Sequence, residues 1–207
     1  MHIPEKTIGE TEVLSFSEAL ELPAEDYDPQ HWLYVPPFYT EYRYILGTRG
    51  ERPLICVGVN PSTAEPGGLD PTLKSVDRIA RGNGYDSFIM FNVCAQRATR
   101  PQDMDAVLDP TLHRENMAAF DYALSLSETP SIWAAWGTII EQRDYLPDCV
   151  REMICLGRAH HAQWFTAGRR SKKGHPHHPL YLRSDSVLEP FDAAAYADSL
   201  IDERKKE

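Results

Sequence analysis

The stretch LICVGVNPSTAEPGGLDPT, residues 54–72, runs from an apolar segment through a turn to a helix start. The apolar run 54–59 is typical of a strand buried on both faces of a parallel sheet. Asn60-Pro61 is a turn signal, and Asp70-Pro71 joins a preferred N-cap residue to Pro at the first helical position. The stretch therefore predicts a strand–loop–helix unit with Asn60 just beyond the strand. LDPTL recurs at 108–112 and predicts a second helix start there.

Strand and helix patterns alternate along the rest of the chain. This alternation predicts an α/β fold with three layers, α/β/α, around a central four-stranded parallel sheet. A single α/β domain is expected over 42–207, and residues 1–41 are expected to be an acidic N-terminal extension packed on it. The predicted strands are 54–59, 87–92, 131–135 and 163–167, with a weaker β segment at 42–46, and the predicted helices are 72–81, 112–126, 139–156 and 193–205.

Composition excludes several classes of protein. No apolar run approaches the ~20 residues of a membrane span, and the polar, acidic N-terminus is not typical of a signal peptide, so we expect a cytoplasmic protein without a membrane partner. The four cysteines form no C-x-x-C pair. They are expected to be small, buried, apolar side chains in a reducing compartment, and neither a metal site nor a cofactor is predicted.

Charge is unevenly distributed along the chain. The formal net charge is −10, but residues 1–30 carry eight acids against one base, while 153–184 contain no acid, six Arg or Lys residues and five of the eight histidines. A local positive patch of this kind can hold a phosphate backbone despite an acidic total. Arg169, Arg170, Lys172 and Lys173 are the candidate phosphate ligands, and an ordinary solvated loop is the alternative interpretation.

In parallel sheets, ligands bind beyond the carboxyl ends of the strands. Asn60, with Pro61 and Ser62, follows the first predicted strand, and Asn92 closes the second. An amide offers a donor and an acceptor, which suits a bound water or the edge of a nucleobase. The alternative is that these asparagines only cap their own turns.

The segment 175–181, HPHHPLY, supplies a third candidate cluster. Its prolines and the absence of nearby carboxylate or cysteine ligands argue against a metal site. His178 is the candidate for stabilising negative charge on a leaving group. Trp136 and Tyr181 are candidates for stacking on a ring, although aromatic side chains are more often part of a core.

These segments carry a family resemblance. VNPSTAEPGGLDPT (59–72), GYDSFIMFNVCAQRATRPQDM (84–104), AAWG (134–137) and GHPHHPLYL (174–182) resemble a bacterial and phage family, domain of unknown function 1643. More remotely, VGVNPS, FIMFNVCAQRAT and HPLY are similar to motifs of the uracil-DNA glycosylase superfamily, in its mismatch-specific thymine/uracil branch. Ser62 departs from the glycine of the first motif, and the last motif is reduced to Pro179-Leu180.

The remote resemblance implies a uracil-DNA glycosylase-like fold and a base-excising activity on DNA. It implies that Asn60 positions the attacking water, Asn92 reads the base and His178 assists the leaving base. Two alternatives remain open at this point. One is a non-catalytic module that binds nucleic acid or a nucleotide, and the other is a hydrolase of a free nucleoside or nucleotide.

Overall fold

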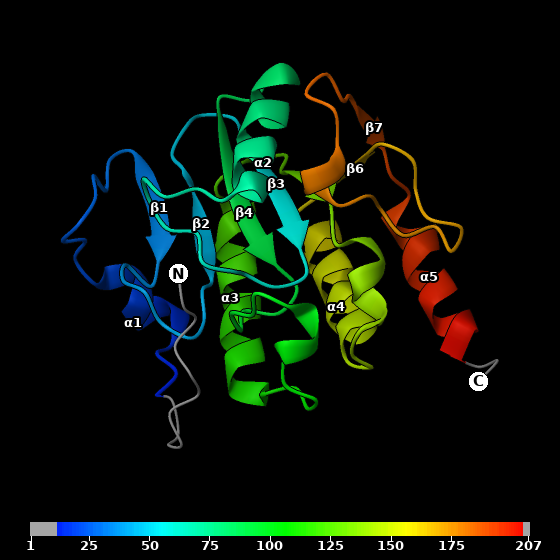
Figure 1. Ribbon diagram of the computed structural model, residues 1–207, viewed down its shortest axis with the longest axis horizontal. Coiled ribbons are helices and arrows are strands. Elements are labelled where there is room, and N and C mark those ends of the chain that lie inside the picture. Colours follow the sequence, from blue (N-terminus) through cyan, green and yellow to red (C-terminus); the bar gives the residue numbers. More distant parts are fainter. Residues whose placement is uncertain (1–11, 205–207) are drawn as a thin grey trace.

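The computed structural model describes residues 12–204 of the chain, shown in Figure 1. Its elements alternate between strands and helices from β3 to β6, as the sequence pattern predicts. The strands are β1 (Trp32–Val35), β2 (Ile45–Thr48), β3 (Pro53–Gly58), β4 (Ser87–Asn92), β5 (Ser131–Ala134), β6 (Gln163–Ala167) and β7 (Leu188–Pro190). The α-helices are α1 (Phe16–Glu21), α2 (Pro71–Gly82), α3 (Pro110–Ser125), α4 (Leu146–Ala159) and α5 (Ala193–Arg204), with short 3₁₀ turns η1 (Pro101–Asp103), η2 (Gly137–Glu141) and η3 (Pro179–Tyr181).

The strands form one mixed sheet in the order β1-β2-β4-β3-β5-β6-β7. The four predicted strands, β4, β3, β5 and β6, are mutually parallel and lie at its centre. β1 and β2 extend one side antiparallel, and β7 pairs antiparallel with β6 on the other. The expected sheet of four parallel strands is therefore wrong in its extent, because the described chain builds a seven-stranded mixed sheet.

Both faces of the sheet are covered, which explains why β3 and β4 are buried at every position. On one face, Ile55, Val57 and Phe91 pack in a large core with α1, α3, α4 and α5. On the other face, Cys56 and Met90 pack in a smaller core with α2. The α/β class is thus confirmed, with a thick helical layer on one face and α2 covering the other (Figure 1).

The helix starts at the two LDPTL segments are confirmed. The Asp70 carboxylate accepts a hydrogen bond from the backbone N–H of Leu73, and the Asp109 carboxylate accepts from Thr111 and Leu112. The helix predicted over 139–156 is wrong over residues 139–145. The chain there forms the 3₁₀ turn η2 and begins α4 only at Leu146, just before Pro147.

Two edge strands escaped prediction because each is short. β1 contains four residues and β7 three, so neither shows enough alternation to stand out from a loop. β1 and α1 both come from residues 12–41, and α1 packs against α3 through the larger core. Residues 1–11 of the expected extension lie outside the described residues.

The pairing of β3 with β4 places the loops that follow these two strands next to each other. Gly58 at the end of β3 lies opposite Asn92 at the end of β4. The two segments stay paired beyond the sheet, since Val93 donates to the Gly58 carbonyl and Ala98 donates to the Pro61 carbonyl. Asn60 and Asn92 are thereby brought to the same edge.

No helix in the described part of the chain is long and apolar enough to cross a membrane.

Candidate functional site

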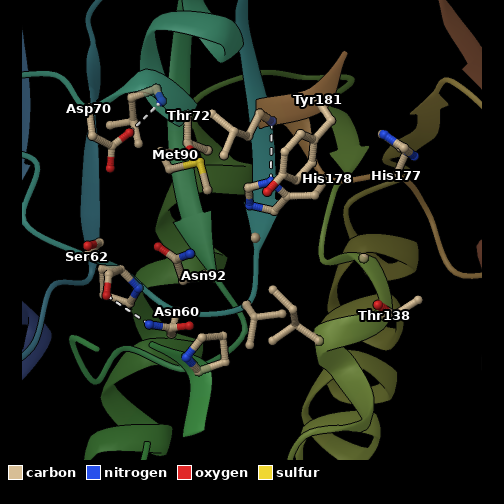
Figure 2. Close-up of a pocket in the computed structure, with 18 of the residues that line it drawn as sticks. Asn60, Ser62, Asp70, Thr72, Met90, Asn92, Thr138, His177, His178 and Tyr181 are labelled. Carbon is tan, nitrogen blue, oxygen red and sulfur yellow. Dashed lines mark hydrogen bonds between the residues drawn. The ribbon is translucent and has the colours of Figure 1, made fainter. Parts of the chain in front are cut away.

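A pocket of about 730 Å³ opens at the carboxyl ends of the parallel strands, the edge expected for ligands in such a sheet. Four loops far apart in the sequence converge on it, as Figure 2 shows. They come from the ends of β3, β4 and β5 and from the segment after β6. The lining includes Arg43, Asn60, Pro61, Ser62, Asp70, Thr72, Met90, Asn92, Gly137, Thr138, Arg169, His175, His177, His178 and Tyr181.

Asn60 is held by backbone carbonyls. Its Nδ2 donates to the carbonyl of Ala98 at 2.7 Å and to that of Pro61 at 3.0 Å. Because carbonyls only accept hydrogen bonds, this pairing fixes which end of the amide is nitrogen. The Oδ1 atom remains to accept a hydrogen bond from whatever occupies the pocket.

Asn92 is held from two sides and is only 1% exposed. Its side-chain Oδ1 accepts from Nη2 of Arg43 at 3.2 Å, and its backbone carbonyl accepts from the Asn116 amide at 3.0 Å. The Asn92 Nδ2 atom is buried and has no hydrogen-bond partner among the described residues. A buried amide donor without a partner costs free energy, and a ligand in the pocket can satisfy it. We call Arg43, Asn60 and Asn92 the pocket floor.

His178 is positioned by η3 and by α2. Ser75 of α2 donates to the Pro179 carbonyl at 2.9 Å, which connects the segment 175–181, here called the histidine loop, to the helix. Nδ1 of His178 accepts from the backbone N–H of Leu180 at 3.3 Å, so the neutral ring carries its proton on Nε2. Burial lowers the pKa of His178, and the neighbouring His177 lowers it further. His178 is therefore a neutral donor, able to hydrogen-bond an atom that gains negative charge.

Gly137, three residues after the end of β5, lies next to His178. Its φ is +62°, a left-handed conformation that strongly favours glycine. A Cβ atom at this position would lie 3.6 Å from the Cβ of His178. Gly137 thus contributes backbone, and no side chain, to the pocket lining.

The remaining predicted residues divide between the pocket and its surroundings. Pro61, Ser62 and Tyr181 line the pocket, and the Tyr181 ring is 77% exposed at its mouth. Trp136 lies elsewhere, fully buried among core rings, where its indole N–H donates to the Tyr196 hydroxyl at 2.9 Å. That hydroxyl is also 2.8 Å from Nδ1 of His175, so Tyr196 connects Trp136 to the histidine loop.

We call Arg169, Arg170, Lys172 and Lys173 the basic rim, and these residues differ in whether they line the pocket. Arg169 lines the pocket. Arg170 instead lies over the ring of Phe191 at 5.8 Å, and Lys173 pairs with Glu141 at 2.7 Å. Lys172 is exposed and is not part of the lining. The structure therefore brings one of the four predicted phosphate ligands to the pocket.

Sequence reasoning missed Arg43 and assigned Asp70 only to helix capping. Arg43 stands between two buried tyrosines in the strand-like segment 42–46, and a charged residue inside such a pattern was a signal for a buried polar site. Asp70 caps α2 as predicted and also lines the pocket. The topology explains this double position, because the start of α2 follows the loop at the carboxyl end of β3.

Side chains that could bind a metal ion are dispersed over the described part of the chain. Within residues 12–204, no three His, Cys, Asp or Glu side chains are grouped closely enough to hold a metal ion. His175 is committed to Tyr196 and to the Glu141 carboxylate, which lies 2.9 Å from its Nε2. What the pocket offers instead is a set of neutral donors and acceptors next to a buried guanidinium.

Comparison with known proteins identifies the family. Residues 43–180 match the family described as protein of unknown function (DUF1643), so the chain belongs to this family. The matched segment includes the pocket floor, the basic rim and His178. No curated protein and no solved structure matches the chain.

Proposed function

We propose that this protein is a DNA glycosylase-like enzyme that hydrolyses the N-glycosidic bond of a flipped, modified or damaged base. One observation carries the proposal: Asn60, Asn92 and His178 line a single pocket, and each is held there by its own hydrogen bond. The remote motif similarity to the uracil-DNA glycosylase superfamily assigns the same three roles. We also propose that the fold is related to that of this superfamily, and that the four parallel strands β4, β3, β5 and β6 are the part they share.

The chemistry follows from the hydrogen-bonding capacity of each side chain. The Oδ1 of Asn60 accepts a hydrogen bond from a water and leaves a water lone pair free to attack C1′ of the sugar. Asn92 Nδ2 donates to the base and holds it in the pocket. As the C1′–N bond breaks, its electron pair leaves with the base, and the Nε2–H of His178 stabilises the resulting anion.

The proton balance needs one more group. The attacking water forms the new C1′–O bond and loses a proton, while the departing base finally gains one. Asp70 is the acidic residue of the pocket lining. Its carboxylate accepts a hydrogen bond from the Leu73 backbone and remains able to take the water proton.

The test is incubation with duplexes that carry uracil, mismatched thymine or phage-type modified bases, followed by detection of abasic sites. We expect product from at least one duplex and a loss of about 10²- to 10³-fold in rate for Asn60→Ala. Gln163→Ala, exposed at the opposite end of β6, is the control and should retain full activity. Absence of abasic product on every duplex would contradict the proposal.

A second candidate is a hydrolase of a free nucleoside or nucleotide. The observation that favours it is the division of the basic rim, in which only Arg169 lines the pocket. One guanidinium suits one phosphate group, whereas a DNA strand is held by several cations. Release of free base from nucleotides, without abasic product from duplexes, is the result that selects this candidate. A non-catalytic binding module would show salt-dependent affinity with no released base in either assay.

A further inference from the structure

The histidine loop is held from both faces of the sheet. Near its end, the Pro179 carbonyl accepts a hydrogen bond from Ser75 of α2, which covers one face. At its start, His175 is 1% exposed, and its Nδ1 lies 2.8 Å from the hydroxyl of Tyr196 in α5. α5 packs beside α4 on the opposite face (Figure 1). His178 lies between these two points of attachment and lines the pocket.

The direction of each hydrogen bond at His175 follows from the groups around it. A hydrogen bond from Lys173 lowers the pKa of Glu141, and one from His175 lowers it further, so Glu141 is an ionised acceptor. Nε2 of His175, 2.9 Å from this carboxylate, therefore carries a proton. In the neutral ring Nδ1 is then an acceptor, and the Tyr196 hydroxyl donates to it.

Trp136 determines the other side of the Tyr196 hydroxyl. An indole N–H can only donate, so the Tyr196 oxygen accepts from Trp136 at 2.9 Å while its proton goes to His175. The two rings also pack together, with centroids 5.6 Å apart, and neither residue is more than 5% exposed. A buried hydroxyl with a donor on one side and an acceptor on the other has one favoured orientation. It therefore joins the segment after β5 to the histidine loop in a defined geometry.

A tight turn connects His175 to the rest of the pocket lining. The Ser171 N–H donates to the His175 carbonyl at 2.9 Å, and the His175 N–H donates to Oγ of Ser171 at 3.1 Å. Gly174, between them, has a φ of +83°. Ser171, His175 and His178 all line the pocket. A displacement of His175 would therefore move pocket-lining backbone on both sides of it.

We propose that Tyr196 is a positioning residue of the pocket: its hydroxyl holds His175 and thereby sets the position of the His178 ring. Tyr196 lies outside the segment 43–180 that matches the family, so α5 contributes to the site from beyond that segment. The structural part of this inference holds without a ligand. Its effect on base release rests on the proposed function.

The position of His178 is tested by long-range ¹H–¹⁵N NMR spectra of the histidine rings, in which the His178→Gln variant identifies the His178 signals. Tyr196→Phe keeps the aromatic ring and removes only the hydroxyl. We expect the signals of His175 and His178 both to shift in this variant. Unchanged His178 signals overturn the proposal.

Tyr44→Phe is the matched control for the loss of a buried hydroxyl. Tyr44 is fully buried, and its hydroxyl donates to the Leu14 carbonyl at 2.7 Å, outside the pocket lining. Each of the two variants should lower the melting midpoint by about 2–4 °C. Only Tyr196→Phe should shift the His178 signals, and equal shifts in both variants would assign the effect to general destabilisation and overturn the proposal.

The route through His175 is tested by a double variant. His175→Phe removes the acceptor of the Tyr196 hydroxyl proton. Adding Tyr196→Phe to His175→Phe should therefore leave the His178 signals where the single His175→Phe variant places them. Additive shifts would assign the effect to another contact of Tyr196 and overturn this route.

Base release from duplexes separates this inference from the proposed function. A misplaced His178 should lower kcat by about 10- to 100-fold with KM nearly unchanged, and Tyr44→Phe should retain the wild-type rate. If no duplex yields an abasic product, the proposed function fails, and the NMR spectra still decide the role of Tyr196. If product forms and Tyr196→Phe retains the wild-type rate, the hydroxyl does not position His178 for the reaction, and the proposal is overturned.

Discussion

The pocket floor and the basic rim both carry positive charge, but they hold it in different environments. In the floor, Arg43 is buried, and its Nη1 and Nη2 atoms donate to the Ala64 carbonyl and to Oδ1 of Asn92. In the rim, residues 169, 170, 172 and 173 are exposed, and Lys173 is paired with an exposed acid. Buried polar groups have one allowed arrangement, whereas exposed charges are screened and mobile. The floor is therefore suited to selecting a ligand and the rim to attracting one.

Removal of the floor guanidinium should have the largest effect on stability. Arg43→Ala leaves the Asn92 Oδ1 without its partner and creates a cavity beneath the pocket. We expect the free energy of unfolding to fall by roughly 2–4 kcal/mol. Urea denaturation measures it. Arg151→Ala, which removes a surface pair with Asp148, is the matched control and should change stability by at most about 0.5 kcal/mol. Similar losses in the two variants would contradict the distinction between buried and exposed guanidiniums.

The space beside Asn92 gives a smaller and more local perturbation. In Gly58→Ala, the new Cβ would lie 2.7 Å from the Met90 Cε and 3.0 Å from Nδ2 of Asn92. We expect a loss of about 1–2 kcal/mol in stability from overpacking, together with weakened ligand binding. Gly82→Ala is the control, because nothing lies within 4 Å of a Cβ there. It should stabilise α2 slightly, since alanine is the better helix former. Unchanged stability and binding in Gly58→Ala would show that the Asn92 position is not confined.

The fold was largely predictable because its central strands have strong local signals. The runs 54–59 and 87–92 are apolar throughout, so burial on both faces follows directly from their composition. The two Asp-Pro helix starts were predictable for a similar reason, since capping depends on neighbouring residues alone. The short edge strands were not predictable, because their pairing is decided by tertiary contacts rather than by their own sequences.

The candidate site was predictable in position but not in polarity. Topology places Asn60 and Asn92 at one edge, which the alternation of strands and helices already implies. Nothing local to Asn92 shows that Arg43, 49 residues away, occupies its oxygen. The same limit applies to the rim, where the sequence shows four cations and only the folded chain separates Arg169 from the others.

His178 is half-buried, so its environment is intermediate between that of the buried floor and that of the exposed rim. Burial lowers its pKa below the ordinary 6.5, so the unfolded chain binds more protons just below that pH. Stability should therefore decrease as pH falls through this window and be fully recovered above it. If the proposed function holds, base release should decrease in the same direction, because the protonated ring loses its acceptor for the Leu180 N–H.

Melting midpoints at about pH 5.5 and 7.5 measure this dependence. His178→Gln should reduce the difference between the two midpoints, and His31→Gln, an exposed histidine, should leave it as in the wild type. A pH dependence that is equal in all three proteins would assign it to other groups.

The smallest effects are expected at the rim, and they test whether a bound oligonucleotide extends beyond the pocket. Arg169 lines the pocket and Lys172 does not. We expect Arg169→Ala to lower the slope of log affinity against log salt by about one for a bound oligonucleotide, and Lys172→Ala to lower it by less than about half as much. Fluorescence anisotropy over a salt series measures both slopes. Equal losses would indicate a strand that runs along the whole rim, and in that case the comparison between a selective floor and an attracting rim applies to DNA rather than to a single nucleotide.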